Sequence, residues 1–257
     1  MRLTRKDFLK LSGTALLTTA MRKFRPLLAA PPEQTIIWQG SSRYPRVALT
    51  YDDCYSIQKL QQLEKILEKH PNVRITLFPV GRMFKENEAK DPGIWKRYYE
   101  KGHEIGYHSY DHTNQQVVSS AYSVADFDRW LNDLREVLDF EPTVRFARPP
   151  YGNASPSFLH MCAVRGQVPT LWSTGWGGST EDVVNYTLPK IKNGDIVLMH
   201  FRAEDMATTE QALPELEARG IQAVTMSCLY LDWLKEQNQP AGCYSDWPPS
   251  LADTCID

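Results

Sequence analysis

The chain has 257 residues, enough for one α/β barrel or two smaller domains with a substantial buried core. Its 29 basic and 31 acidic residues give a formal net charge of −2, and 42% of the residues are hydrophobic. This balance is ordinary for a globular protein and gives no electrostatic reason to expect a nucleic-acid partner.

The first thirty residues have the order of an export signal. Arg2, Arg5 and Lys6 precede a modest apolar stretch, Leu11–Ala20. That stretch is too short to cross a bilayer, so we expect no integral membrane segment. We expect an exported, extracytoplasmic protein; a basic, partly helical extension on a cytoplasmic protein is the alternative.

The segment Thr4–Lys10 looks like a twin-arginine signal in which Lys6 replaces the second arginine. Lysine lacks the guanidinium fork, so this departure counts against the match. Cleavage could follow Ala20 or Ala30, and the sequence leaves the boundary open. We divide the chain into an export signal (1–30), a linker (31–44), a main folded domain (45–235) and a tail with Pro and Cys residues (236–257).

From residue 46 onward, short apolar runs alternate with amphipathic helical patterns, which is typical of βα units around a parallel sheet. The sequence predicts seven strands, and seven strands favour a barrel. They are Val47–Tyr51, Ile75–Val80, Glu104–Tyr107, Val144–Ala147, Thr170–Ser173, Ile196–Met199 and Gln222–Met226.

The helices between these strands follow from apolar spacing. The first runs from Ile57 to about Lys69 and ends before Pro71, and another carries an apolar face from Phe127 to Leu138. Pro214 interrupts the last pattern before the seventh strand, so we expect that helix to kink or to start late.

Polar and aromatic residues follow five of the predicted strands. They are Asp52–Asp53, His108, Arg148–Tyr151, Trp172–Trp176 and His200. In a closed α/β barrel the carboxyl ends of the strands converge on one face, where active sites of this architecture lie. The sequence therefore predicts one pocket built from distant segments.

His108 and His112 are four residues apart, and the acidic pair Asp52–Asp53 ends the first strand. Catalytic metal sites use three protein ligands and an open position, so two imidazoles and one carboxylate suffice, which leaves the second carboxylate free as a base. The same His spacing also occurs by chance on solvated helices. We interpret the chain as a metal-dependent hydrolase.

Four motifs in order make the chain resemble the polysaccharide deacetylases of the NodB-homology type, carbohydrate esterase family 4, over residues 45–235. They are Thr50-Tyr51-Asp52-Asp53, His108-Ser109-Tyr110-Asp111-His112, Arg148-Pro149-Pro150-Tyr151 and Leu198-Met199-His200. The resemblance implies a single-domain, distorted (β/α)7 barrel.

The resemblance also implies roles. Asp53, His108 and His112 would bind a divalent metal, with Zn2+ the first choice and Co2+, Ni2+ or Fe2+ as alternatives. Asp52 would be the general base, oriented by Arg148, and His200 the general acid. The backbone N–H of Tyr151 would stabilise the oxyanion, and Tyr151, Trp172 and Leu198 would line the substrate pocket.

Each assignment has a structural alternative. Asp52 or Asp53 could cap the helix that begins near Ser56, Arg148 could form a surface ion pair, and His200 could be a core imidazole. Trp172 could pack in the core. We interpret His70, His103 and His160 as structural or surface residues.

The sequence departs from the family pattern at three places. No carboxylate occurs from Trp172 until Glu181, although the family usually places there an Asp that pairs with the motif arginine. Arg148 should therefore be held less firmly, or by another partner. Cys54 stands where Gly is usual, and Phe201 where Asp is common.

Five cysteines leave at least one unpaired within a monomer. A bond between Cys243 and Cys255 would fix the tail in an oxidising compartment, with Cys228 as an alternative partner. We expect Cys54 and Cys162 to be small apolar residues within the fold.

The predicted activity is removal of N-acetyl or O-acetyl groups from a glycan such as peptidoglycan, chitooligosaccharide or xylan, with release of acetate. One alternative is a catalytically impaired homologue that only binds glycan. Another is a hydrolase of non-sugar amides. The identity of the glycan and the oligomeric state stay open.

Overall fold

A parallel sheet centred on β1 (Arg46–Asp53) organises the computed structural model, which describes residues 35–237 and 255. Its strand order is β3-β2-β1-β7-β6, and β8 also pairs with β1. The bounds are β2 Thr76–Pro79, β3 Glu104–Ile105, β6 Thr174–Gly175, β7 Ile196–Met199 and β8 Gln222–Val224. Every pairing is parallel, as the βα pattern predicted.

A second, two-stranded parallel sheet pairs β4 (Phe146–Ala147) with β5 (Val168–Pro169). A parallel bridge between Tyr107 and Ala147 joins it to the segment that follows β3. Ile37 bridges to Thr170, and Gln39 to Asp195, so part of the segment predicted as a linker is built into the fold. The strands thus follow one another around an irregular barrel.

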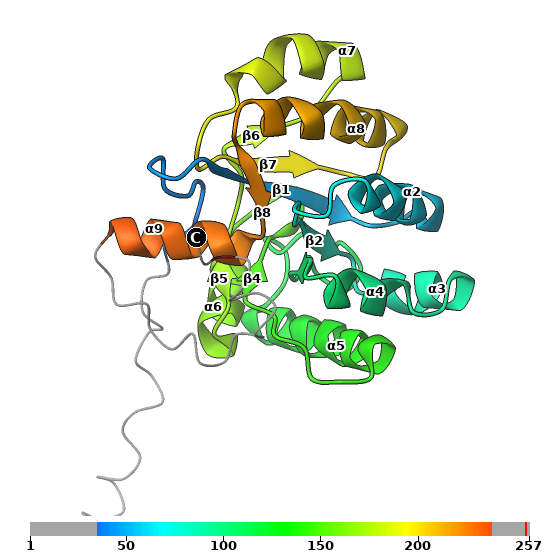
Figure 1. Ribbon diagram of the computed structural model, residues 1–257. Helices are drawn as coiled ribbons and strands as arrows, with labels where there is room; N and C mark the ends of the chain where they lie inside the picture. The colour runs from blue at the N-terminus through cyan, green and yellow to red at the C-terminus, as the bar shows by residue number, and fades with distance from the viewer. Residues whose placement is uncertain (1–34, 238–254, 256–257) are drawn as a thin grey trace, which may run out of the picture. The chain divides into compact units, whose positions relative to one another are not determined.

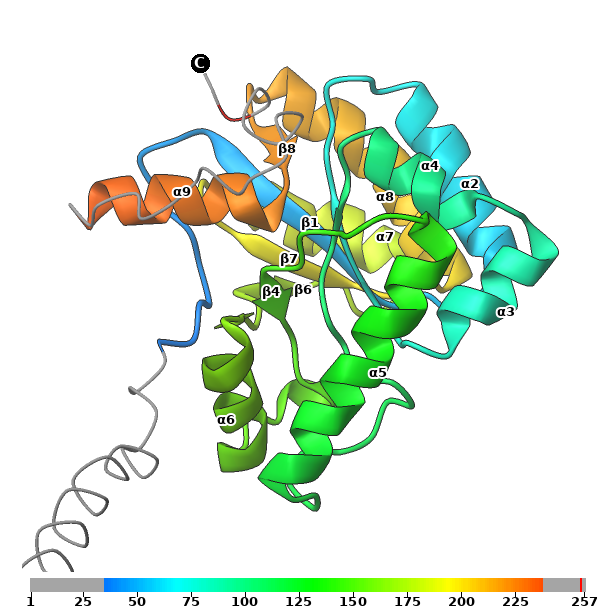
Figure 2. The same ribbon diagram turned by 90° about the horizontal axis from the view of Figure 1, so that it is seen from below.

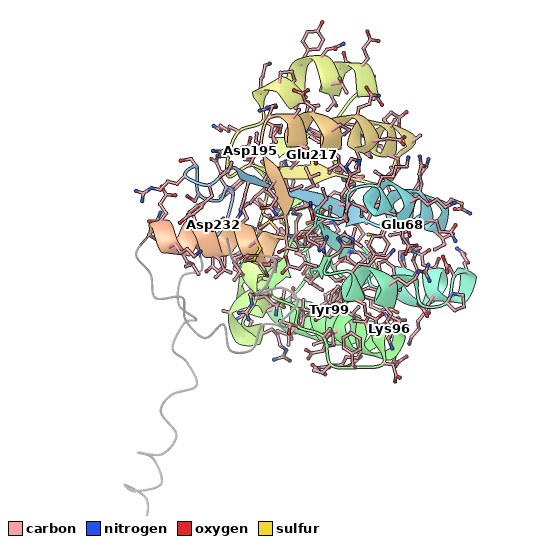
Figure 3. All side chains as sticks on the ribbon, in the orientation of Figure 1. Glu68, Lys96, Tyr99, Asp195, Glu217 and Asp232 are labelled. Atoms are coloured by element: carbon pink, nitrogen blue, oxygen red, sulfur yellow. A yellow bond between two sulfur atoms is a disulfide. The ribbon has the colours of Figure 1, made fainter. Side chains whose placement is uncertain are left out.

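The fifth strand was predicted wrongly. Thr170–Ser173 lies between β5 and β6, because Leu171 donates its N–H to the carbonyl of Ile37 (2.8 Å) while Ser173 bonds to the buried Asp195 (2.8 Å). Figure 3 labels Asp195. The last strand ends at Val224 and not at the predicted Met226, because Thr225 caps the next helix.

Helices lie outside the strands (Figures 1 and 2). Their bounds are α2 Ile57–Glu68, α3 Met83–Lys90, α4 Ile94–Glu100, α5 Ser120–Leu138, α6 Pro156–Arg165, α7 Thr180–Asp182, α8 Ala203–Ala218 and α9 Met226–Glu236. Irregular helical turns follow α7 at Val183–Thr187 and Leu188–Lys190.

The apolar stripes predicted for two helices are the buried ones. α2 buries Leu60, Leu63, Ile66 and Leu67, and α5 buries Phe127, Trp130, Leu134 and Leu138. The expected late start before Pro214 is wrong, because α8 begins at Ala203 and contains this proline. None of the helices within residues 35–237 has the length and apolar character needed to cross a membrane.

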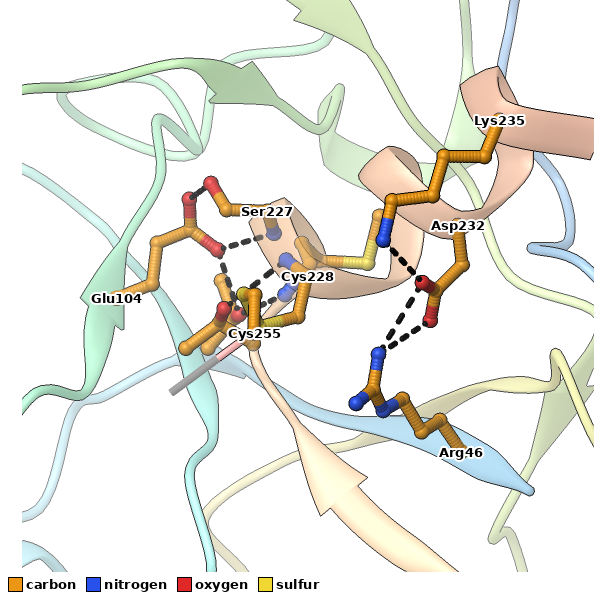
Figure 4. Close-up of a disulfide and its surroundings, with 10 residues drawn as sticks. Arg46, Glu104, Ser227, Cys228, Asp232, Lys235 and Cys255 are labelled. Atoms are coloured by element: carbon orange, nitrogen blue, oxygen red, sulfur yellow. Dashed lines mark hydrogen bonds and ion pairs between the residues drawn. A yellow bond between two sulfur atoms is a disulfide. The ribbon is translucent and has the colours of Figure 1, made fainter. Parts of the chain in front are cut away.

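Helix α9 covers the amino ends of the central strands (Figure 4). Buried Glu104, the first residue of β3, accepts hydrogen bonds from the hydroxyl and the N–H of Ser227. Arg46, the first residue of β1, pairs with Asp232 at 3.0 Å. These contacts leave the carboxyl ends of the strands for other residues.

A disulfide between Cys228 and Cys255 ties the tail to α9. The alternative partner considered for Cys255 is therefore the one used, and Cys243 lies outside the described residues. Cys54 and Cys162 are free and buried, as predicted. The predicted export signal also lies outside the described part of the chain.

Gly81 marks a close approach between the turn after β2 and the loop after β3. Its N–H donates to the carbonyl of Ser109 (3.0 Å). A Cβ at this position would lie 2.7 Å from ring atoms of both Trp130 and Tyr110. Only glycine lets the two segments meet at this distance.

We therefore expect Gly81→Ala to lower the free energy of unfolding by about 1–3 kcal/mol, the usual cost of overpacking. Urea unfolding followed by circular dichroism measures this change. Gly177→Ala is the control, since a Cβ there meets nothing within 4 Å. Equal stability of the two variants would contradict the close approach.

Candidate functional site

The carboxyl ends of three paired strands bring the predicted residues to one edge. In the parallel register Asp52 lies opposite Phe78, Asp53 opposite Pro79, and Tyr51 opposite Met199. The acidic pair at the end of β1 is thus level with the end of β2 and with His200, which follows β7. This is the convergence that the barrel architecture predicts.

The three predicted metal ligands point at one another. Asp53 Oδ1 lies 3.5 Å from His108 Nε2 and 3.3 Å from His112 Nε2. These atoms form a group, within 4.8 Å of one another, that could hold a metal ion. Ligands at about 2.0–2.1 Å from a tetrahedral ion are about 3.3 Å apart, so the spacing fits a first-row divalent metal.

Hydrogen bonding supports this fit. Asp53 Oδ1 is buried without a hydrogen-bond partner in the described structure. His108 Nδ1 lies 2.9 Å from the carbonyl of Arg148, so it donates there and leaves the Nε2 lone pair facing Asp53. Lone pairs held this close repel one another unless a cation or a proton lies between them. The donor set therefore suits a divalent ion.

The backbone is strained at the same place. Asp53 and His112 have positive φ angles of 73° and 57°, and Tyr151 has one of 61°. Non-glycine residues in this region cost on the order of 1 kcal/mol each and cluster at functional sites. Cys54, where the family usually has glycine, also has a positive φ of 57°. Asn87 donates to the Cys54 carbonyl (2.9 Å), which holds this turn in place.

Electrostatics sets the charges of the group. Burial opposes ionisation of Asp53, but His108, His112 and His200 together hold the pKa of this carboxyl below its usual range. Burial likewise disfavours the charged form of His108, yet Asp52 and Asp53 raise its pKa. Burial and the neighbouring His108 lower the pKa of His112.

Asp52 is 3% exposed and pairs with Arg148, whose Nη1 donates to Asp52 Oδ1 at 2.7 Å. The other oxygen, Oδ2, lies 3.8 Å from His108 Nε2, on the side of the metal ligands. Neither acid caps α2, because Ser56 accepts from the N–H of Lys59. Asp52 is thus held beside the triad with one oxygen facing it.

Arg148 is fully buried, so a surface ion pair is excluded. Nη1 also donates to Thr50 Oγ1 (2.8 Å), and Nη2 donates to the carbonyl of Leu171 (3.0 Å). Its Cζ lies 4.2 Å from the ring centre of Phe78 and 5.8 Å from that of Trp172. Backbone, hydroxyl and aromatic groups therefore surround the guanidinium where the family usually has a second carboxylate.

Trp172, predicted to line the substrate pocket, lies against Arg148, and its Nε1 would be 4.0 Å from a Cβ at Gly175. Besides facing Arg148, its ring would lie 3.0 Å from a Cβ at Gly152. A cavity of about 500 Å3 is lined by Gly175, Trp176, Gly177, Leu198, His200 and Arg202. The structure brings Leu198 and His200 together with Trp176, which our prediction of the pocket did not name as a wall.

Trp176 is buried, and its Nε1 has no hydrogen-bond partner in the described residues. Its backbone N–H donates to the Leu198 carbonyl (2.9 Å), and its carbonyl accepts from Arg202 (2.9 Å). The signal in the sequence was a tryptophan between glycines just after a strand. Phe201 packs its ring 5.8 Å from that of Tyr51.

Tyr151 projects at the rim. Its side chain is 65% exposed, and its ring centre lies 4.6 Å from that of His112. Tyr151 thus lies beside one of the predicted metal ligands, and its role as a pocket wall stays a prediction. Of the remaining histidines, buried His103 accepts a hydrogen bond from the N–H of Ile75 (3.3 Å), and burial lowers its pKa to about 3. It is a neutral structural residue.

Comparison with known proteins gives concordant results. The sequence model of the family described as polysaccharide deacetylase matches residues 39–166. A peptidoglycan-N-acetylglucosamine deacetylase of Bacillus cereus is 27% identical over 75% of this chain and 71% of its own length. PgdA of Listeria monocytogenes, named for the same activity, is 32% identical over 72% of this chain but only 39% of its own length.

Solved structures show the same fold. A peptidoglycan N-acetylglucosamine deacetylase superposes with a TM-score of 0.68 at 26% identity, over 77% of this chain and 94% of the other. A CE4-family pseudoenzyme from Bacillus anthracis gives 0.68 at 23% identity, over 78% and 69%. The predicted distorted barrel is confirmed. With its motifs, its fold and these relatives in agreement, the chain belongs to the polysaccharide deacetylase family, carbohydrate esterase family 4.

Proposed function

We propose that the chain is an exported, metal-dependent deacetylase that hydrolyses acetyl groups of a cell-envelope glycan. The convergence of Asp53, His108 and His112 beside Asp52, which Arg148 holds, is the observation that carries the proposal. Residues of this kind and spacing serve hydrolysis by water at a metal.

Asp53, His108 and His112 would hold the ion, and Zn2+ suits two imidazoles and one carboxylate. A divalent ion bound there would act as a Lewis acid toward water and the acetyl carbonyl. Asp52 is the base that accepts the proton of the attacking water, because one of its oxygens faces the triad while Arg148 holds the other. Asp53 therefore binds the ion, and Asp52 is not a ligand and can act as the base.

His200 is the proton donor to the departing amine or alkoxide, and it lies on the wall of the cavity beside Leu198 and Trp176. We assign the acetyl group to this cavity. The Tyr151 N–H is the donor that stabilises the developing oxyanion. This assignment rests on the motif and on the position of Tyr151 against His112.

For the substrate we place the N-acetylglucosamine of peptidoglycan first, since the relatives from Bacillus cereus and Listeria monocytogenes are named for it. O-acetylated xylan comes second, because a bifunctional xylanase/deacetylase of Pseudobutyrivibrio xylanivorans is 29% identical over 72% of this chain. The disulfide between Cys228 and Cys255 fits an oxidising, extracytoplasmic compartment.

A chelator should abolish acetate release from acetylated chitooligosaccharides and peptidoglycan fragments, and added Zn2+ should restore it.

Asp52→Asn should keep the metal, measured by elemental analysis, and lower kcat by about 100-fold to 10,000-fold, the usual contribution of a general base to the rate. Asparagine retains an oxygen that can accept from Arg148, so the fold should persist. Loss of metal in this variant would contradict the division between base and ligand.

Metal affinity should depend on pH in a defined way. The pKa of His108 is raised above its usual 6.5, so this imidazole must lose a proton when the ion binds, whereas His112 and Asp53 have lowered pKa values. We expect affinity for Zn2+ to fall about tenfold per pH unit once the pH drops below the His108 pKa. Calorimetric titrations between pH 6 and 8 measure this slope, and a flat profile would contradict it.

The placement of Trp172 predicts a positioning role through Arg148. Trp172→Ala should lower kcat by about 5-fold to 30-fold, because a partly buried ring facing a guanidinium stabilises it by about 1–2 kcal/mol, while KM changes little. Trp172→Phe should keep most of the rate, and Trp38→Ala, at an exposed site, is the control. A rise in KM with unchanged kcat would contradict the positioning role and indicate that Trp172 lines the acetyl pocket.

One alternative is a homologue that binds glycan without catalysis, and a pseudoenzyme is among the proteins of similar structure. Such a protein would bind glycan in calorimetry but release no acetate with any metal. A hydrolase of non-sugar amides would act on small acetylated amides and leave every glycan intact. Parallel screens of both substrate classes separate the three functions.

A further inference from the structure

Two exposed side chains lie beside the metal ligands and have no part in the roles assigned so far. Tyr55 follows Asp53 by two residues and is 40% exposed. Arg82 follows β2 at the same edge of the sheet and is exposed. Because both lie at the carboxyl ends of the strands, next to the proposed metal ligands, we ask what part of the substrate they contact.

The turn that carries Arg82 is fixed to both ligand-bearing segments. The N–H of Val80 donates to the carbonyl of Asp53 (3.1 Å), and that of Arg82 donates to the carbonyl of Tyr110 (3.1 Å). Together with the Gly81 bond to Ser109, these contacts leave little freedom in the backbone. Arg82 therefore starts from a defined point beside the triad.

Tyr55 supports the Arg82 side chain. The guanidinium Cζ lies 5.4 Å from the centre of the Tyr55 ring, within the range of a cation–π contact. Burial raises the pKa of the Tyr55 hydroxyl, and Asp53 and Tyr151 act in the same direction while Arg82 opposes them. The Tyr55 ring thus lies against the Arg82 guanidinium, two residues along the chain from Asp53.

Within the described part of the chain, Arg82 has no carboxylate to balance its charge. No carboxylate within residues 35–237 lies at ion-pair distance from it, whereas Arg202 at the cavity pairs with Asp205 (2.8 Å) and Arg148 with Asp52 (2.7 Å). A guanidinium offers a planar fork that matches a carboxylate, and the aromatic face below it limits its motion. This combination suits an anionic group of the substrate.

We propose that Arg82, supported by Tyr55, binds a carboxylate on the sugar next to the acetylated one, and so makes the enzyme prefer acidic glycans. The inference rests on the proposed function. The carboxylate could come from the lactyl or peptide group of a muramic acid in peptidoglycan or from a uronic acid on xylan. Both present the same planar anion.

The experiment compares matched substrates. A peptidoglycan fragment with free carboxylates is tested against the same fragment with its carboxylates converted to amides, and a uronic-acid-bearing acetylated xylan oligosaccharide against an unsubstituted one. For each pair the ratio of kcat/KM for acetate release is measured with the zinc-loaded full chain. Calorimetric Kd values for the same pairs, measured on Asp52→Asn, give a readout that does not need turnover.

We expect the charged member of at least one pair to be preferred, and Arg82→Gln to reduce that preference by about 3-fold to 10-fold in both readouts. Arg82→Lys should restore part of it, and added salt should weaken it. Lys90→Gln, at the other end of α3, is the matched control and should leave the ratio unchanged. The pair that responds identifies the source of the carboxylate.

Equal use of charged and amidated substrates by the wild type, or an unchanged ratio in Arg82→Gln, would overturn the inference. Either result would leave the proposed deacetylase function unaffected. No acetate release from any glycan would overturn the proposed function. In that case a Kd preference for the charged fragment that disappears in Arg82→Gln would still support anion binding by Arg82. The absence of any such preference would refute anion binding.

Discussion

The buried pair of Arg148 and Asp52 is the interaction on which the site depends. The side chain of Arg148 fixes one oxygen of Asp52, while its backbone carbonyl accepts from His108 Nδ1 and so turns Nε2 toward Asp53. One residue thereby orients both the proposed base and a proposed metal ligand. Because removing one partner of a buried pair costs about 3–5 kcal/mol, the two side chains constrain each other strongly.

The surroundings of Arg148 show how the fold tolerates the loss of the usual second carboxylate. A guanidinium between two carboxylates would be overcompensated in charge, whereas here one acid balances it and two further N–H groups donate to neutral oxygens of Thr50 and Leu171. Phe78 and Trp172 cover its faces. Its Nε lacks a hydrogen-bond partner in the described structure, a cost that the rings reduce only in part.

Local sequence patterns predicted the parallel strands and the buried faces of α2 and α5, because these depend on spacing along the chain. The grouping of Asp53 with His108 and His112 was implied by the resemblance of the motifs to the family. The division of Trp172 and Trp176 between Arg148 and the cavity depends on where the chain turns after β5, and Ile37 and Asp195 fix that turn from far away in the sequence. The choice of Cys228 as the partner of Cys255 likewise depends on the docking of α9. Periodicity carries no information on such contacts.

The two ends of the strands have opposite roles in stability. At the carboxyl ends, positive φ angles at Asp53, Cys54, His112 and Tyr151 and a group of facing lone pairs all cost free energy. At the amino ends, Glu104 meets the first turn of α9, Arg46 meets Asp232, and a disulfide adds a covalent link. Since β1 runs through both ends, firm packing at one end lets the other hold strained residues in place for chemistry.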